Sequence, residues 1–149
     1  MTEPLVILDA VTPQRLALLQ SHAPDRFVME AGKSREPADQ IAAIQRARFA
    51  ITGQVPVTGE MIRAGAAAGL VAVHKWGVGT DNIDLGAARE AGVRILRTTG
   101  SNAVPVAETA LGFMIALSRG MVRGHVELAQ GQWRPYELGG QMLSGRTVG

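Results

Sequence analysis

The chain has 149 residues, of which 46% are apolar and 19% charged, and these proportions indicate a globular domain rather than a disordered segment. A formal net charge of +2 and an aromatic content of 4% argue against nucleic-acid binding. The lack of cysteine excludes disulfides, thiolate metal sites and cysteine nucleophiles. There is no signal peptide and no apolar run near the roughly 20 residues of a membrane helix, so we expect a soluble, cytoplasmic protein without membrane contact.

Short apolar runs alternate with helical segments through the first two thirds of the chain, as they do in parallel α/β proteins. The predicted strands span residues 5–8, 26–30, 49–52, 70–73 and 93–96. Each connection is a compact crossover, which predicts a flavodoxin-like, doubly wound sheet of five parallel strands. The second strand carries charge at both ends, and we expect it near an edge of the sheet.

Three polar residues stand where helices are predicted to begin. Thr12 precedes Pro13, a favoured residue at the first helical position, and Thr58 precedes the helix before the fourth strand. Asp84 precedes a helix predicted over residues 85–91. We therefore expect all three side chains to cap helix N-termini.

The fourth predicted strand runs into Gly77-Val78-Gly79 and then into the helix that Asp84 opens. Glycines there allow either a positive φ or a close approach of the backbone to a ligand. Strand, glycine loop and helix together can hold a small anion on main-chain N–H groups, and Lys75 would add positive charge. A simple tight turn and a solvated strand-end lysine are the alternatives.

The same loop does not fit two other kinds of site. It fails the dinucleotide fingerprint G-x-G-x-x-G because residue 82 is Asn, and no acidic residue lies near position 98 to bind a ribose. Asp81 and Asp84 have no third hard ligand at a useful spacing. We therefore predict neither a dinucleotide phosphate site nor a metal site here.

No catalytic residue is predicted in the chain. His22, His74 and His125 lie far apart in the sequence and match no triad or zinc motif. His74 follows a buried strand, where a hydrogen-bonded structural role is expected. Ser101 lacks the second glycine of a nucleophile elbow.

The last third of the chain has a different pattern. Pro105 begins a long predicted helix whose residues 110–117 are apolar on every side, which indicates burial between two domains or two subunits. Gly120 and Gly124, one turn apart, would let another backbone come close, or are merely tolerated. A turn and a strand are predicted over residues 144–149, and the chain stops inside that element, so we expect a cut C-terminus.

Three blocks of sequence, residues 77–84, 88–93 and 101–108, resemble the D-isomer-specific 2-hydroxyacid dehydrogenases in order and spacing. That family includes phosphoglycerate dehydrogenase and glyoxylate/hydroxypyruvate reductase. The first seventy residues resemble it only in their strand–helix rhythm. The resemblance implies a flavodoxin-like substrate-binding domain over residues 1–101. Residues 102–149 would then be an interdomain and dimerisation helix and the start of a Rossmann domain that binds NAD or NADP.

The resemblance also implies roles for individual residues. The N–H groups of Val78 and Gly79 would hold the substrate carboxylate, and Lys75 stands where some members carry a basic substrate contact. Asn102 would line the active-site cleft. Val106 would touch the nicotinamide half of the cofactor, and Val78 would border it too.

The resemblance further implies a homodimer interface along the helix from Pro105 to Gly124 and a hydride transfer between NAD(P) and a small D-2-hydroxy or 2-keto acid. The family's catalytic arginine, acid and histidine would lie beyond Gly149, so the chain alone is expected to be inactive. Trp76 and residues 52–54 depart from the arginine-bearing pattern of phosphoglycerate-type members, which argues against a phosphorylated substrate.

Two other classes of function are compatible with the same fold. One is a stand-alone flavodoxin-like binding or signalling module. Thr52 and Arg97 stand where a receiver domain needs an acid and a lysine, and only Thr12 could serve a flavodoxin's phosphate loop. The other is a dehydrogenase-like transcriptional corepressor, for which no specific feature is present.

Overall fold

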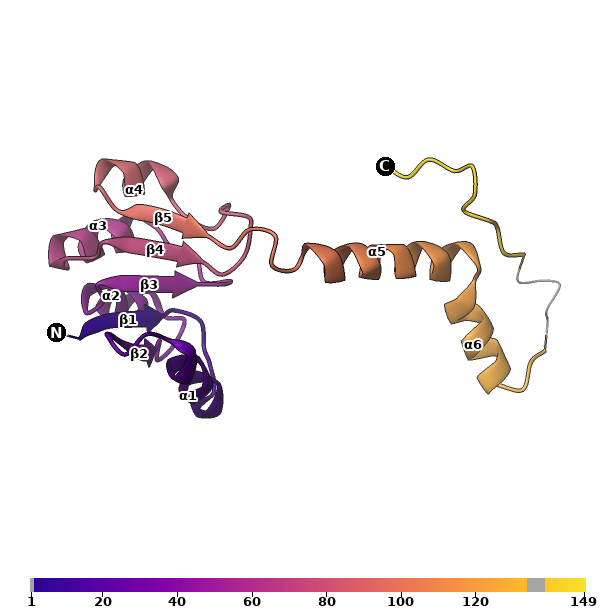
Figure 1. Ribbon diagram of the computed structural model, residues 1–149, viewed down its shortest axis with the longest axis horizontal. Coiled ribbons are helices and arrows are strands. Elements are labelled where there is room, and N and C mark those ends of the chain that lie inside the picture. The colour runs from indigo at the N-terminus through magenta and orange to yellow at the C-terminus, as the bar shows by residue number, and fades with distance from the viewer. Residues whose placement is uncertain (1, 134–138) are drawn as a thin grey trace. The chain divides into compact units, whose positions relative to one another are not determined.

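The computed structural model describes residues 2–133 and 139–149, and Figure 1 shows its elements. The chain divides into two compact units, Met1–Thr99 and Gly100–Gly149. The predicted assignment of residues 102–149 to the start of a nucleotide-binding domain stays a prediction.

The first unit alternates strands and helices from end to end. Its strands are β1 (Glu3–Ile7), β2 (Phe27–Ala31), β3 (Phe49–Thr52), β4 (Ala72–Lys75) and β5 (Arg94–Arg97). Its helices are α1 (Pro13–His22), α2 (Pro37–Gln45), α3 (Gly59–Ala68) and α4 (Leu85–Glu90). All strand pairs are parallel, in the order β2-β1-β3-β4-β5, which confirms the flavodoxin-like prediction and the edge position of β2.

The fourth strand lies two residues further along the chain than predicted. Leu70 follows the C-cap of α3: Gly69 has a left-handed φ of 107°, and the Leu70 N–H donates to Gly65 O at 2.9 Å. The apolar run therefore begins before the strand does. As a result, His74 and Lys75 lie within β4 rather than beyond it.

Successive side chains of each strand point to opposite faces of the sheet. Val6, Ala50 and Val73 lie on one face and join the buried side chains of α2, α3 and α4 in the main core. Ile7 and Ile51 lie on the other face, where α1 packs. The core thus fixes the strands whose carboxyl ends carry the loops of interest.

The three predicted N-caps are confirmed. Each side-chain oxygen accepts a hydrogen bond from the backbone N–H three residues later, which satisfies one of the helix's unpaired donors. The pairs are Thr12 with Arg15 at 3.3 Å, Thr58 with Met61 at 3.3 Å and Asp84 with Ala87 at 2.9 Å.

The second unit contains α5 (Ala103–Ser118) and α6 (Met121–Ala129), so the prediction of one helix from Pro105 through Gly124 is wrong. Gly120 has φ 62° and ψ 28°, a left-handed conformation that ends α5 and that glycine adopts without steric cost. Gly124 lies inside the next helix. The two glycines therefore do not share one continuous helix face.

The expected strand near the end of the chain is also wrong. The structure has a turn at residues 144–145, but residues 146–149 form no strand. A strand needs a neighbour to pair its backbone groups, and the described residues of the second unit offer none.

The described residues of the second unit do not provide the predicted burial of α5. None of its sixteen residues, all of which the structure describes, is buried, and Phe113 and Leu117 are 65% and 80% exposed. The described helices include none with the length and hydrophobicity to cross a bilayer.

Candidate functional site

The loop between β4 and α4 lies at the carboxyl edge of the parallel sheet, where α/β proteins bind their ligands. We call residues 76–82 the glycine loop. Neither Gly77 nor Gly79 has a positive φ. Of the two expected uses of these glycines, close approach of the backbone is therefore the one that this structure allows.

Three consecutive backbone N–H groups in the glycine loop have no protein acceptor. Within residues 2–133 and 139–149, the N–H groups of Gly77, Val78 and Gly79 donate to no backbone or side-chain oxygen. The loop is accessible, with Val78 50% exposed. Successive unpaired N–H groups form the kind of concavity that binds small anions.

Strand β5 determines which way two of these N–H groups point. Gly77 O accepts from Thr98 N at 3.1 Å, and Val78 O accepts from Arg97 Nη1 at 3.5 Å. A trans peptide is planar, with its C=O and N–H pointing in opposite directions. The N–H groups of Val78 and Gly79 therefore point away from the end of β5.

The two glycines differ in the space around them. A Cβ atom added at Gly79 would lie 2.7 Å from Asp81 Oδ1, which is closer than real Cβ contacts. One added at Gly77 would meet only Lys75 Cε, at an ordinary 3.6 Å. A side chain at position 79 therefore requires the Asp81 carboxylate to move, whereas one at position 77 requires no such shift.

Lys75 is not the solvated strand-end lysine of the alternative interpretation, because only 9% of it is exposed. Its Nζ donates to Gly53 O and, at 2.8 Å, to Asn82 Oδ1. No carboxylate in the described part of the chain forms an ion pair with it. The edge of the sheet thus holds a buried positive charge bound only by neutral oxygens.

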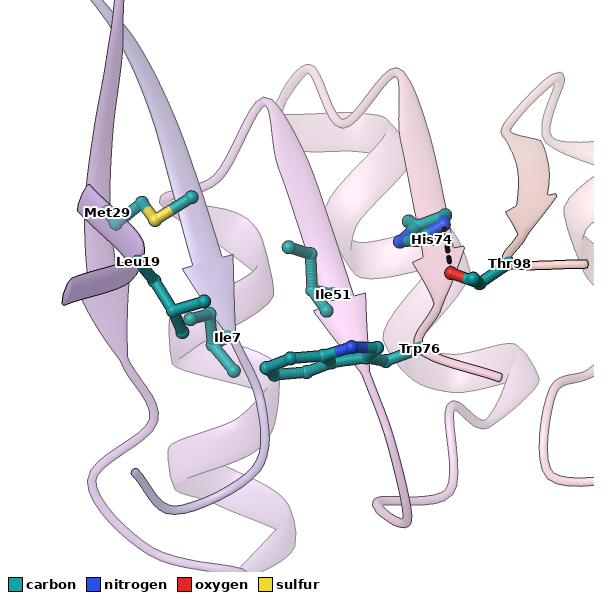
Figure 2. A pocket seen from close by; sticks show the side chains of 7 residues that line it. All are labelled: Ile7, Leu19, Met29, Ile51, His74, Trp76 and Thr98. Atoms are coloured by element: carbon teal, nitrogen blue, oxygen red, sulfur yellow. Dashed lines mark hydrogen bonds between the residues drawn. The ribbon is translucent and has the colours of Figure 1, made fainter. Parts of the chain in front are cut away.

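A small apolar cavity of about 230 Å³ lies on the α1 face of the sheet (Figure 2). His74 Nε2 and Thr98 Oγ1 face each other there at 3.2 Å, in agreement with the expected hydrogen-bonded histidine. Burial lowers the pKa of His74 below its ordinary value of 6.5. The other lining residues are Ile7, Leu19, Met29, Ile51 and Trp76.

His74 should make folding stability depend on pH. Because its folded-state pKa is lowered, the unfolded chain binds a proton more readily. The stability is fully present above about pH 6.5 and is lost as the pH falls through the lower pKa of the folded state. Urea unfolding between about pH 5 and pH 8 should therefore show a smaller acid-side decline in His74→Gln, which does not titrate there. An unchanged slope would contradict this assignment. His22→Gln, at an exposed histidine, is the matched control.

The remaining candidates lie in the second unit. Asn102 and Val106 line a shallow groove of about 390 Å³ at the start of α5, together with Pro105 and Phe113. The structure therefore places Lys75, Val78 and Gly79 together at one loop, and Asn102 and Val106 together on one helix. A contact between the two sets stays a prediction.

Sequence reasoning missed Arg97 and Thr98, which orient the glycine loop. The parallel register pairs Lys75 with Arg97, so the residues after β5 necessarily lie beside the residues after β4. Knowledge of the strand order would have been enough to find them. Asp84 is held by its cap contact with Ala87, which leaves Asp81 as the loop's solvent-facing acid.

Comparison with known proteins assigns the family. Residues 5–144 match the model of the D-isomer specific 2-hydroxyacid dehydrogenase catalytic domain. The chain belongs to this family. It is 41% identical over 93 residues to hydroxypyruvate reductase of Thermotoga maritima, covering 62% of this chain and 30% of that protein.

Solved structures agree in fold. A protein of Polaromonas sp. JS6 66 has a TM-score of 0.77 at 25% identity, covering 98% of this chain and 46% of that one. The NAD-dependent formate dehydrogenase of Staphylococcus aureus, solved with NAD, has a TM-score of 0.73 at 25% identity, covering 91% of this chain and 44% of that one. The chain spans less than half the length of these relatives.

The family uses NAD(P), but the glycine loop does not fit the cofactor's pyrophosphate. The position of the third fingerprint glycine is Asn82, whose side chain accepts from Lys75 and donates to Val55 O at 3.0 Å. The whole sequence contains no G-x-G-x-x-G. Of the predicted cofactor contacts, the apolar side chains of Val78 and Val106 remain as candidates.

Proposed function

We propose that this chain is the substrate-binding part of an NAD(P)-dependent D-2-hydroxyacid dehydrogenase, with the glycine loop as the carboxylate site. The consecutive N–H groups of Gly77, Val78 and Gly79, which have no acceptor among the described residues, support this proposal best. In the intact enzyme, NAD(P) would supply the hydride chemistry at C2 of a small 2-hydroxy or 2-keto acid. The 149-residue chain by itself should be inactive.

Each candidate residue has a proposed role in that enzyme. The N–H groups of Val78 and Gly79 donate to the carboxylate, and charged acceptors strengthen such hydrogen bonds. Lys75 contributes positive charge behind the loop. Asn102 lines the cleft, while Val106 and the side chain of Val78 border the nicotinamide of NAD or NADP.

A small, non-phosphorylated acid is the proposed substrate class. Trp76 and Gln54, both exposed in the loops after β4 and β3, are themselves uncharged and supply none of the cations that a phosphate would require. Hydroxypyruvate, which a relative's name specifies, is such an acid. The family assignment favours this proposal over a stand-alone flavodoxin-like module.

Binding of oxalate, a stable mimic of a 2-keto acid, tests the carboxylate site. Titration of the ¹⁵N-labelled chain should shift the amide resonances of residues 77–79 most strongly, with chloride at the same ionic strength as the control. Shifts that match those of chloride would overturn the proposal. Steady-state assays of the chain with NADH and glyoxylate or hydroxypyruvate should show no turnover. Clear turnover would refute the proposal that the chain is only the substrate-binding part of the enzyme.

A homodimer through α5 and α6 is part of the same proposal. Large apolar side chains of α5 and α6 are exposed, among them Phe113 at 65% and Leu117 at 80%, and a second copy would cover them. Sedimentation equilibrium should show a dimer that Leu117→Glu dissociates. Leu18→Glu, at a residue 59% exposed on α1, should leave the dimer intact. The cytoplasmic location stays a prediction.

A further inference from the structure

Lys75 closes the glycine loop with its own side chain. The residue stands immediately before the loop, and its Nζ donates to Asn82 Oδ1 at 2.8 Å, at the loop's far end. Its Cε lies 3.6 Å from where a Cβ of Gly77 would be, so the stem runs close to the start of the loop. The free N–H groups of residues 77–79 thus lie between the two ends that Lys75 joins.

The same ammonium group reaches the neighbouring loop. Lys75 Nζ also donates to Gly53 O, directly after β3. On its other side Gly53 donates its N–H to the Asp9 carboxylate, which also accepts from Gln54 N at 2.8 Å. Opposite charges therefore hold the two sides of Gly53, and the loops after β1, β3 and β4 form one hydrogen-bonded network.

Asn82 completes this network. Its Nδ2 donates to Val55 O at 3.0 Å, while its backbone O accepts from Val57 N at 2.8 Å. These contacts fix the far end of the glycine loop to the segment after β3. If the ammonium group of Lys75 were removed, the partly buried oxygens Asn82 Oδ1 and Gly53 O would lose their charged donor. The loss of that donor would destabilise the loop.

We propose that Lys75 is a positioning residue: by joining Gly53 and Asn82, it holds the N–H groups of Val78 and Gly79 in the orientation that binds a carboxylate. This inference rests on the proposed carboxylate site. It assigns Lys75 an action through the loop instead of a direct contact with substrate. Its buried ammonium, which has no carboxylate partner in the described chain, adds a favourable field for an anion on the loop.

The absence of cysteine permits a chemical test in the whole chain. Lys75→Cys can be alkylated in urea with 2-bromoethylamine, which restores an ammonium at lysine length, or with 1-bromopropane, which gives an uncharged side chain of equal length. Both products are refolded. Wild type carried through the same steps and Lys33→Cys, at the chain's other lysine, which is exposed, are the controls.

Two readouts follow on each product. Without ligand, the propyl form should displace the amide resonances of Val78 and Gly79 while those of β3 stay in place, and the aminoethyl form should return them. With oxalate, the propyl form should bind about tenfold more weakly, and the aminoethyl form should recover wild-type affinity. The Lys33 series should match wild type in both measurements.

The outcomes separate the two proposals. An oxalate affinity that falls while the ligand-free resonances of Val78 and Gly79 stay unchanged would mean that Lys75 acts on the ligand through its charge, by field or by direct contact, and would overturn positioning. If the propyl form displaces the resonances of Val78 and Gly79 but wild type does not bind oxalate, the proposed carboxylate site is wrong. The assignment of Lys75 as the residue that positions the loop would then still stand. If the propyl form does not fold, Asn82→Ala replaces it, because this variant removes the hydrogen bond between Lys75 and Asn82 and keeps the ammonium group. Asn82→Ala must then displace the amide resonances of Val78 and Gly79. Unchanged resonances would overturn the inference.

Discussion

Replacement of Ile62 by alanine should lower the free energy of unfolding of the first unit by about 2–5 kcal/mol. Ile62 lies on α3, has no exposed surface and packs in the core between the helices and the sheet. The loss has two contributions: the transfer free energy of the removed side-chain atoms and the free-energy cost of the cavity that they leave. Because domains are stable by only about 5–15 kcal/mol, the variant should lose much of its stability.

Urea unfolding followed by far-ultraviolet circular dichroism measures this effect. Leu18→Ala is the matched control, since Leu18 is 59% exposed on α1 and should change stability by no more than about 0.5 kcal/mol. Equal losses in the free energy of unfolding for Ile62→Ala and Leu18→Ala would mean that α3 does not pack in the core as described.

Replacement of Gly79 by alanine should weaken oxalate binding by about tenfold, while Gly77→Ala changes it by less than about twofold. The methyl group at position 79 would meet the Asp81 carboxylate, and relief of that contact must move the side chain or the N–H groups beside it. At position 77 the added methyl group would make only an ordinary van der Waals contact with the side chain of Lys75.

The same NMR titration measures both variants, and the two proteins differ only in where the methyl group sits. Similar affinities for Gly79→Ala and wild type would remove Gly79 from the site. Thermal unfolding serves as the control for folding, because Asp81 is exposed and can move at little cost in stability.

Features that depend on neighbouring residues could be predicted from the sequence. The caps at Thr12, Thr58 and Asp84 were among them, because each side chain bonds an N–H three residues away. The flavodoxin-like parallel sheet followed from compact crossovers, since parallel strands in one sheet connect in a single favoured hand. The family blocks then located the glycine loop.

Features that depend on distant partners could not be predicted. The contacts of Lys75 and Asp9 with Gly53 span 22 and 44 residues, and no local pattern reports them. The break at Gly120 depends on the backbone conformation chosen there, and glycine is compatible with several. The burial of α5 was inferred from its apolar sequence, but that sequence does not identify the surface that would cover it.

The order in which the strands pair sets when the glycine loop becomes competent during synthesis. β4 and its loop leave the ribosome before β5, yet Thr98 N and Arg97 provide the contacts that orient the peptides of Gly77 and Val78. Before β5 is added to the sheet, the loop lacks these contacts. If the proposed carboxylate site is correct, its anion affinity therefore depends on the last strand to be synthesised.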